Sequence, residues 1–306
     1  GKEGTLKVSQ TVVRHKSDGG RPKGQGRTFE TKGRINQKGV DDMLLVIDVG
    51  NTNIVLGVYK GKKLVASWRM TTSNSQTADE IGIFIRQLFD YSEVDALEID
   101  AIIISSVVPN IMYSLIHGLV KYFHIQPMIV GAGMKTGVNL LMDNPREMGA
   151  DRIVKLVAAY EIYGGPAMVI DYSTATTYDV INEKGVFVTG ITAPGIQICA
   201  EALTVCTAQL PNVEIRKPKS IIVKNTIGSL QAGIVYGHIG ETKYIIEQVK
   251  EELGLPELKV IATGGMAKIM ESNGPLFDVI DPLLTLKGLR IVYEKNKKAK
   301  TEKDKK

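Results

Sequence analysis

The 306-residue sequence lacks the residues on which several protein classes depend. Its two cysteines, Cys199 and Cys206, have a spacing that fits neither a zinc site nor a CxxC redox motif. The sequence has no run of 18 apolar residues and no apolar segment typical of a secretory signal near its N-terminus, so we expect a cytoplasmic protein without a membrane span. The P-loop pattern GxxxxGK[ST] is also absent, which disfavours a P-loop kinase.

Charge is distributed unevenly along the chain. The formal net charge is +5, but residues 1–42 carry +5 and residues 291–306 carry +4, which leaves −4 on residues 43–290. Because the basic residues gather at the two ends, the net charge does not indicate a nucleic-acid-binding body, and we expect no nucleic-acid partner. With 43% hydrophobic and 23% charged residues, the composition is that of a globular protein and excludes a collagen-like or largely disordered chain.

The hydrophobic pattern predicts four segments. Residues 1–42 contain eight glycines and ten basic residues without a sustained apolar period, and we expect a disordered basic leader there. Residues 43–165 and 166–291 are predicted to form two domains, and residues 292–306 a basic, solvated tail.

The same order of elements, β-β-β-α-β-α, is predicted in both domains. In the first we expect strands over 43–49, 53–59, 64–70, 101–106 and 127–130, and helices over 77–89, 110–122 and 145–163. In the second we expect strands over 167–172, 176–181, 186–191, 258–262 and 277–280, and helices after Gly195, over 226–252 and after Pro282. This repetition predicts a duplicated α/β fold, with a mixed sheet flanked by helices in each half.

A polar turn follows the first apolar strand. Asp48 lies at the end of that strand, and Gly50 and Asn51 tolerate the positive φ of a tight turn. Asn51, Thr52 and Asn53 add backbone and side-chain donors. Such a turn can bind phosphate oxygens while Asp48 holds a hydrated cation, although a plain hairpin turn explains the same residues.

A second turn of this kind opens the second half. Asp171 ends an apolar strand and is followed by the hydroxyl residues Ser173 and Thr174. Two such turns in duplicated halves are expected to face each other across a cleft and to bind the phosphates of one nucleotide from both sides. A third turn, Thr263–Gly265, would allow an adenosine moiety to approach closely.

Seven ordered segments carry a resemblance to a known family. They are DVGNTN (Asp48–Asn53), TADEIG (Thr77–Gly82), NPREMGADR (Asn144–Arg152), DYSTATTYD (Asp171–Asp179), GITAPGI with AEAL (Gly190–Leu203), KNT with SLQAG (Lys224–Gly233) and TGG (Thr263–Gly265). Over about residues 43–290 the sequence resembles the type III pantothenate kinases of the acetate and sugar kinase, heat-shock ATPase and actin superfamily. The resemblance implies two actin-like ATPase (ribonuclease H-like) domains with the active cleft between them. It also implies ATP-dependent phosphorylation of pantothenate to 4′-phosphopantothenate, the first step of coenzyme A biosynthesis.

The resemblance also implies which residues bind pantothenate. Asp151 is the general base for the primary hydroxyl, and Gly149, Ala150 and Arg152 bind the substrate together with it. A planar guanidinium such as that of Arg152 suits a substrate carboxylate. Thr226 is expected to contact pantothenate from the partner subunit of a homodimer. Without the resemblance, Asp151 is explained equally simply as a first-turn acid that complements the helix dipole.

The nucleotide is expected to bind at the two Asp turns. By the same resemblance, Thr174 contacts an ATP phosphate, Asp48 holds Mg²⁺ through water, and Asp171 holds a monovalent cation, K⁺ or NH₄⁺. The first turn supplies the remaining ATP contacts, from Asp48, Val49, Gly50, Asn51, Thr52, Asn53, Ile54 and Val55.

One departure from the family pattern lies in the second turn. Ser173 stands where the pattern Asp-x-Gly-Thr has glycine, and a Cβ there is expected to weaken ATP binding. Two other functions are compatible with the sequence. One is phosphorylation of a different small carboxylate or sugar, against which the GADR and KNT segments argue. The other is a non-catalytic role in transcription through the basic ends, against which Asp151 argues.

Overall fold

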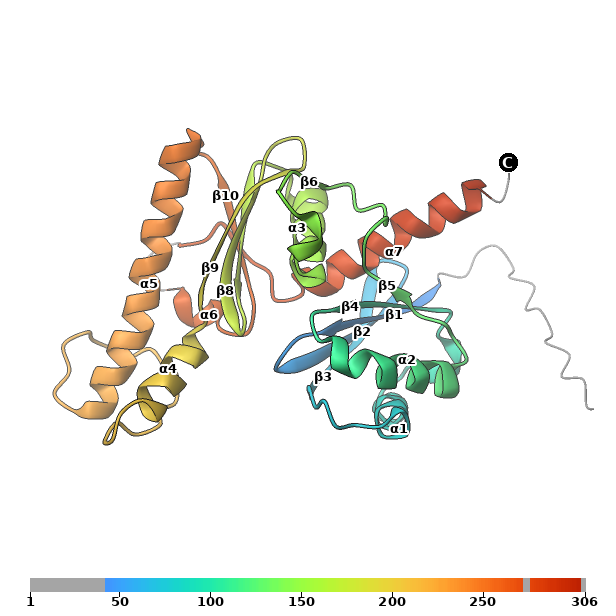
Figure 1. Cartoon of the computed structure of the whole chain (residues 1–306), viewed down its shortest axis with the longest axis horizontal. Coiled ribbons are helices and arrows are strands. Elements are labelled where there is room, and N and C mark those ends of the chain that lie inside the picture. Colours follow the sequence, from blue (N-terminus) through green and yellow to red (C-terminus); the bar gives the residue numbers. More distant parts are fainter. Residues whose placement is uncertain (1–41, 272–275, 304–306) are drawn as a thin grey trace, which may run out of the picture. The chain divides into compact units, whose positions relative to one another are not determined.

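The computed structural model describes residues 42–271 and 276–303 (Figure 1). Nearly all of the predicted leader therefore lies outside the described residues. The described residues belong to one compact unit.

The first sheet has five strands in the order β3-β2-β1-β4-β5. Strands β1, β2 and β3 form an antiparallel meander, and β4 and β5 add to β1 in parallel. Helices α1 (Ala78–Asp90) and α2 (Pro109–Phe123) accompany this sheet. The strands are β1 (Met43–Val49), β2 (Asn53–Lys60), β3 (Lys63–Thr71), β4 (Ala101–Ser106) and β5 (Met128–Ile129).

The second sheet repeats this arrangement and adds one strand, β6, at the edge beside β9. Its order is β11-β10-β7-β8-β9-β6, with β7, β8 and β9 antiparallel and β10 parallel to β7. The predicted duplicated α/β fold with two mixed sheets is confirmed. The strands are β6 (Asn139–Leu140), β7 (Ala167–Tyr172), β8 (Ala175–Ile181), β9 (Val186–Pro194), β10 (Lys259–Thr263) and β11 (Val279–Ile280).

The remaining helices are α3 (Ala150–Tyr163), α4 (Ile196–Val205), α5 (Thr226–Leu253), α6 (Ala267–Met270) and α7 (Leu284–Lys303), with short 3₁₀ turns at Ala96–Glu98 and Pro145–Glu147. Helix α7 continues past residue 291 into the stretch expected to be a solvated tail, and Val292 within it is fully buried.

The single helix predicted over 145–163 is wrong. A 3₁₀ turn at Pro145–Glu147 is separated from α3 by Met148 and Gly149, and Gly149 has the extended backbone of an N-cap (φ −57°, ψ 139°). Its carbonyl accepts the first hydrogen bond of α3, from the backbone N–H of Arg152. Glycine costs backbone entropy inside a helix, so this position favours the break. Helix α3 therefore begins one residue before Asp151.

Helix α3 packs against both sheets. Val154 and Val157 belong to an apolar cluster with β1 and α7, whereas Leu156 and Ala159 belong to a cluster with β7 and β10. In Figure 1 the second sheet lies between α3 and α5. A side chain on the α3 side of either sheet can therefore reach the helix that carries Asp151.

Strand alternation places both strand-end aspartates on that side. Successive side chains of a strand point to opposite faces. In β1, Leu45 and Ile47 pack in the core of α1 and α2 while Leu44 and Val46 pack with α3 and α7, so Asp48 falls on the α3 side. In β7 the even-numbered residues pack against α5 and the odd-numbered ones against α3. Asp171 therefore also falls on the α3 side.

Candidate functional site

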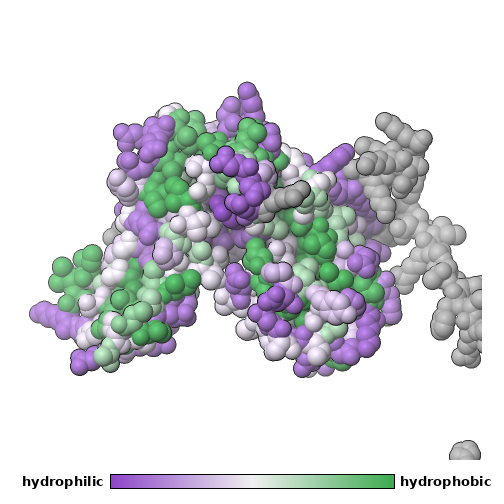
Figure 2. All heavy atoms as spheres, in the orientation of Figure 1, coloured by the Kyte–Doolittle hydropathy of each residue, from purple (hydrophilic) through white to green (hydrophobic). Residues whose placement is uncertain are grey.

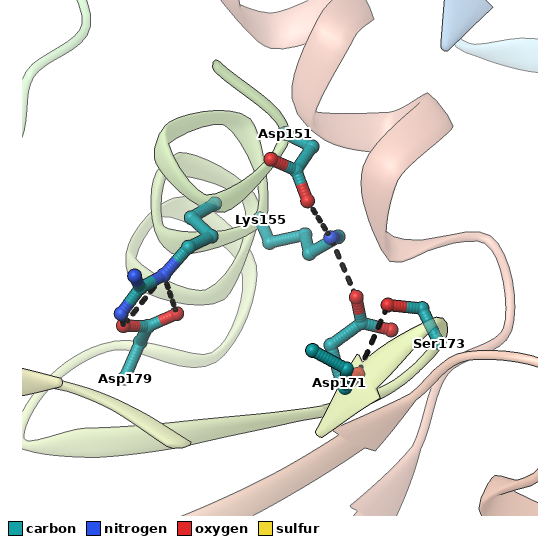
Figure 3. A network of polar contacts seen from close by, with 7 residues as sticks. Asp151, Lys155, Asp171, Ser173 and Asp179 are labelled. Carbon is teal, nitrogen blue, oxygen red and sulfur yellow. Dashed lines mark hydrogen bonds and ion pairs between the residues drawn. The ribbon is translucent and has the colours of Figure 1, made fainter. Parts of the chain in front are cut away.

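Lys155 of α3 is the centre of a charged cluster (Figure 3). Its Nζ donates to Oδ2 of Asp151 at 2.6 Å and to Oδ2 of Asp171 at 2.7 Å. The residue is only 5% exposed. Burial disfavours the charged ammonium, but Asp171, Asp151 and Asp48 outweigh it and raise the pKa of Lys155 above its usual value. Lys155 is therefore a permanent buried cation.

Asp48 lies beside this cluster, and its buried Oδ1 has no hydrogen-bond partner. Burial raises the pKa of its carboxyl to about 6; the Lys155 charge opposes this shift, and Asp151 and Asp171 reinforce it. A buried carboxylate oxygen without a partner is costly in the protein alone and would be satisfied by a hydrated cation. Asp48 therefore fits the predicted role of holding Mg²⁺ through water, since Mg²⁺ usually keeps several waters and binds one or two carboxylates together with substrate phosphates.

The two polar turns meet, as the sequence predicts. The Thr52 and Thr174 hydroxyl oxygens lie 3.1 Å apart although they are 122 positions apart in the sequence. The first turn is closed by the Gly50 N–H, which donates to the Asn53 carbonyl at 3.0 Å. Thr72 fixes it from β3's end, donating its hydroxyl to the Gly50 carbonyl at 2.6 Å. Hydroxyls from both halves therefore converge beside the Asp48 and Asp171 strand ends.

The second turn is built without a positive φ at Ser173. Among the described residues other than glycine, only His124 has a positive φ, so the backbone at Ser173 does not require glycine. Ser173 donates both its N–H and its hydroxyl to the Ala175 carbonyl, at 3.1 and 3.2 Å. Its side chain thus closes the turn locally. Gly264 does need its left-handed backbone (φ 92°), and a Cβ there would collide with the Tyr172 carbonyl.

Arg152 is partly buried and forms an ion pair with Asp179. Its Nε donates to Asp179 Oδ2 at 2.9 Å, and its Nη2 donates to Asp179 Oδ1, so the pair is bidentate (Figure 3). Burial raises the pKa of Asp179 and Arg152 opposes the shift. Gly190 leaves the space that the pair fills, since a Cβ there would strike both side chains. The guanidinium expected to bind the substrate carboxylate is thus already paired along one edge.

Some of the other predicted site residues lie at the first turn, and one lies far from the Asp151 cluster. Val49 and Ile54 pair across β1 and β2 and are fully buried in the core, so they can offer a ligand only backbone atoms. Val55 is half-buried on the opposite face of β2. Thr226 begins α5, which packs on the face of the second sheet opposite Asp171, so one chain does not bring Thr226 to the Asp151 cluster.

Two residues of the site were missed by the sequence analysis. Lys155 follows Asp151 by one helical turn and is the only charged residue between Arg152 and Glu161, so a lone lysine in an apolar helical run was the available signal. Asp179 lies in an alternating strand, where an inward-facing acid requires a partner. Which partner each residue has could not be deduced from spacing.

The described residues hold no group of three or more His, Cys, Asp or Glu side chains arranged to bind a metal ion. Within the same residues, no helix is both long and apolar enough to span a membrane. A hollow of about 330 Å³ lies between β9 and α5, lined by residues including Val188, Ile191 and Tyr244, and none of the predicted site residues line it.

Comparison with known proteins identifies the family of this chain. A curated type III pantothenate kinase from Agathobacter rectalis is 54% identical over 253 residues, which are 83% of this chain and 97% of that protein. A crystal structure from Campylobacter jejuni, described as a conserved putative Baf family transcriptional activator, has a TM-score of 0.51 and 17% identity, covering 83% of this chain and 99% of that one; it supports the fold alone. The sequence model of type III pantothenate kinases matches residues 44–248. With that match and the 54% identical relative, the chain belongs to the type III pantothenate kinase family.

Proposed function

We propose that this chain transfers the γ-phosphoryl group of ATP to the primary hydroxyl of pantothenate, giving ADP and 4′-phosphopantothenate for coenzyme A biosynthesis. The observation that supports this most directly is the position of Asp151. It lies at the start of α3, 22% exposed on its side chain, in an ion pair with Lys155 and beside the strand ends that carry the two polar turns. To remove a proton from an alcohol, an enzyme needs a carboxylate oxygen that is accessible to the substrate beside the bound phosphates.

In the proposed reaction Asp151 accepts the hydroxyl proton as the oxygen attacks phosphorus. Its Oδ2 is occupied by Lys155 Nζ, which leaves Oδ1 as the accepting atom. Mg²⁺, when bound with ATP, would supply charge neutralisation at the phosphates, and Asp48 would hold it through water.

The two turns bind ATP in this proposal. The Asp48–Asn53 turn and Thr174 supply hydroxyl and N–H donors to the phosphates, and Ile54 and Val55 contribute only through their backbone or strand position. The Gly264 turn provides the close backbone approach that an adenosine moiety needs. The K⁺ or NH₄⁺ expected at Asp171 is not part of this proposal, because Lys155 Nζ lies 2.7 Å from Asp171 Oδ2.

Pantothenate binds next to Gly149, Ala150 and Arg152 in this proposal. The bidentate pair with Asp179 fixes the guanidinium plane and leaves Nη1 outside the pair, so Arg152 can still donate to a carboxylate. A Cβ at Gly149 would meet Asp151 Oδ1, so the glycine keeps that oxygen accessible.

A homodimer completes the proposed site. Thr226 lies on the far side of the second sheet from Asp151, so a threonine that contacts pantothenate has to come from a second copy. Figure 2 shows hydrophobic side chains gathered over α4 and the start of α5. They include Ile198, Leu203, Val205, Ile221, Ile222 and Ile227, of which Val205 and Ile222 are about four-fifths exposed. An exposed apolar surface of this kind marks an interaction site.

A coupled assay of ADP release tests the activity. We expect ADP formation that depends on pantothenate and is negligible with ATP alone or with a sugar in its place. A mass measurement should show the product 80 Da heavier than pantothenate, about the mass of one added phosphoryl group. Equal ADP release with and without pantothenate would contradict the proposed substrate.

Light scattering tests the dimer. We expect twice the chain mass at assay concentration, and loss of both the dimer and the activity in Ile222→Asp. Val65→Asp, at an exposed apolar residue of β3 in the other half, serves as the control and should remain dimeric and active. A fully active monomer would contradict the shared site.

A further inference from the structure

We infer that the Lys155 ammonium is a built-in monovalent cation, so phosphoryl transfer by this chain requires no K⁺ or NH₄⁺ from solution. The inference rests on the proposed function, because it assigns a role to Lys155 at the phosphate end of the same site. Nζ lies between Asp151 and Asp171 rather than pointing to solvent (Figure 3).

The position of Nζ excludes a second cation on the same atoms. It is 2.7 Å from Asp171 Oδ2, which is direct contact, and the lysine side chain is 6% exposed. An ion bound to that oxygen would lie against the ammonium, and two like charges in contact repel strongly in a buried site. The residues present therefore do not fit a soluble cation at Asp171 Oδ2.

The charge around Lys155 explains why a cation is needed there at all. Asp48, Asp151 and Asp171 all act on its charge, so one ammonium faces three carboxylates. Adding ATP phosphates to uncompensated carboxylates would be repulsive. An alkylammonium is a tethered ammonium ion: it offers the same charge and N–H donors as NH₄⁺. Because Lys155 is part of α3, its ammonium is always present in the site and does not depend on the salt in solution.

The donor geometry leaves capacity for the nucleotide. Lysine has three N–H donors, and two of them donate to Asp151 and Asp171. Among the described residues Nζ has no third acceptor, so one N–H is left for a phosphate oxygen. The single Nζ atom of Lys155 would then contact Asp151, which accepts the proton, Asp171 at the second turn, and a phosphate oxygen of ATP.

The test compares salts at matched ionic strength in the full-length protein. We expect pantothenate-dependent ADP formation at rates within about twofold in potassium, ammonium, sodium and choline chloride, since choline is too large to replace a bound ion. Lys155→Asn should lose at least about tenfold in choline and recover a large part of that loss in potassium or ammonium chloride. Lys121→Asn removes an exposed lysine that pairs with Asp79 away from the site, and it should behave as the wild type in every salt.

A second measurement does not depend on turnover. The melting temperature of Lys155→Asn should rise in potassium chloride relative to choline chloride, whereas that of the wild type should not differ between the two.

Activation of the wild type by potassium of tenfold or more overturns the inference and leaves the proposed function intact. Absence of pantothenate-dependent ADP in every salt refutes the proposed function instead. In that case a potassium-dependent rise in the wild-type melting temperature would also overturn the cation inference, and a rise confined to Lys155→Asn would support it. If Lys155→Asn does not fold, the wild-type salt comparison alone decides.

Discussion

The two halves of the duplicated fold end their first strands in the same residue type but in opposite electrostatic states. Asp48 is partly buried, with a buried, unpartnered Oδ1 and a pKa raised to about 6. Asp171 is more deeply buried, at 4% exposed, and is neutralised by Lys155 at 2.7 Å. The first turn is thus prepared for a cation that comes with the nucleotide, whereas the second already contains one. Duplication preserved the backbone, and one side chain on a neighbouring helix made the two turns chemically different.

The two turns also differ in how they are supported. The first turn is fixed by Thr72, which donates to the Gly50 carbonyl. The second is closed by Ser173 and backed by Gly264, whose missing side chain leaves room for the Tyr172 carbonyl. Single substitutions in and beside each turn can therefore distinguish residues that act in catalysis, residues that compensate charge and residues that support the turn.

Asp151→Asn should have the largest effect. If the turns bind ATP and Asp151 removes the proton, turnover should fall by about two to four orders of magnitude while ATP binding by both turns persists. Turnover and nucleotide affinity are measured separately, by coupled assay and by calorimetry. Asp143→Asn, at an exposed acid before α3, is the control and should be unaffected. Near wild-type turnover in Asp151→Asn would remove it as the base.

Replacing the two strand-end aspartates should change stability unequally. Asp171→Asn leaves buried Lys155 with one partner fewer and should cost about 3 kcal/mol, at the low end for a broken buried pair because Asp151 remains. Asp48→Asn removes a carboxylate that has an unsatisfied oxygen and should change the free energy of unfolding by less than about 1 kcal/mol. Urea unfolding without ligands measures both. Equal losses would show that the two aspartates have the same environment after all.

Gly264→Ala tests the support of the second turn. Positive φ and the collision with Tyr172 should together cost about 2 kcal/mol in the free energy of unfolding, and ATP binding should weaken. Gly265→Ala is a matched control, because the nearest atom to its Cβ would be 3.9 Å away. If both variants unfold at the same urea concentration, close packing at Gly264 does not matter.

Ser173→Gly should have the smallest effect. Because Ser173 has no positive φ and its hydroxyl closes the turn, glycine loses a hydrogen bond and adds flexibility. We expect the KM for ATP to rise about two- to fivefold, equivalent to at most about 1 kcal/mol, and the KM for pantothenate to stay within about twofold. Steady-state kinetics with each substrate varied measures this. Tighter ATP binding by the variant would show that the serine Cβ obstructs the phosphates.

Much of the fold could be predicted from the sequence because it depends on local patterns. The apolar strands that carry Asp48 and Asp171 lie close to their predicted positions. The errors occur where local signals are weak. Two-residue strands such as Asn139–Leu140 have too few positions for a pattern, and the apolar period over 145–163 concealed the break at Gly149.

The sequence by itself determined which residues carry charge and on which face of a strand or helix each one lies, because periods of 2 and 3.6 residues follow from backbone geometry. Only the tertiary structure decided which charges meet. Lys155 reaches Asp171 because α3 packs against the second sheet, and Arg152 reaches Asp179 across the same interface. Buried charges need partners, and a partner is selected by the packing of elements that are distant in the chain. The cation at Asp171 was expected from solution, and the fold placed a lysine there.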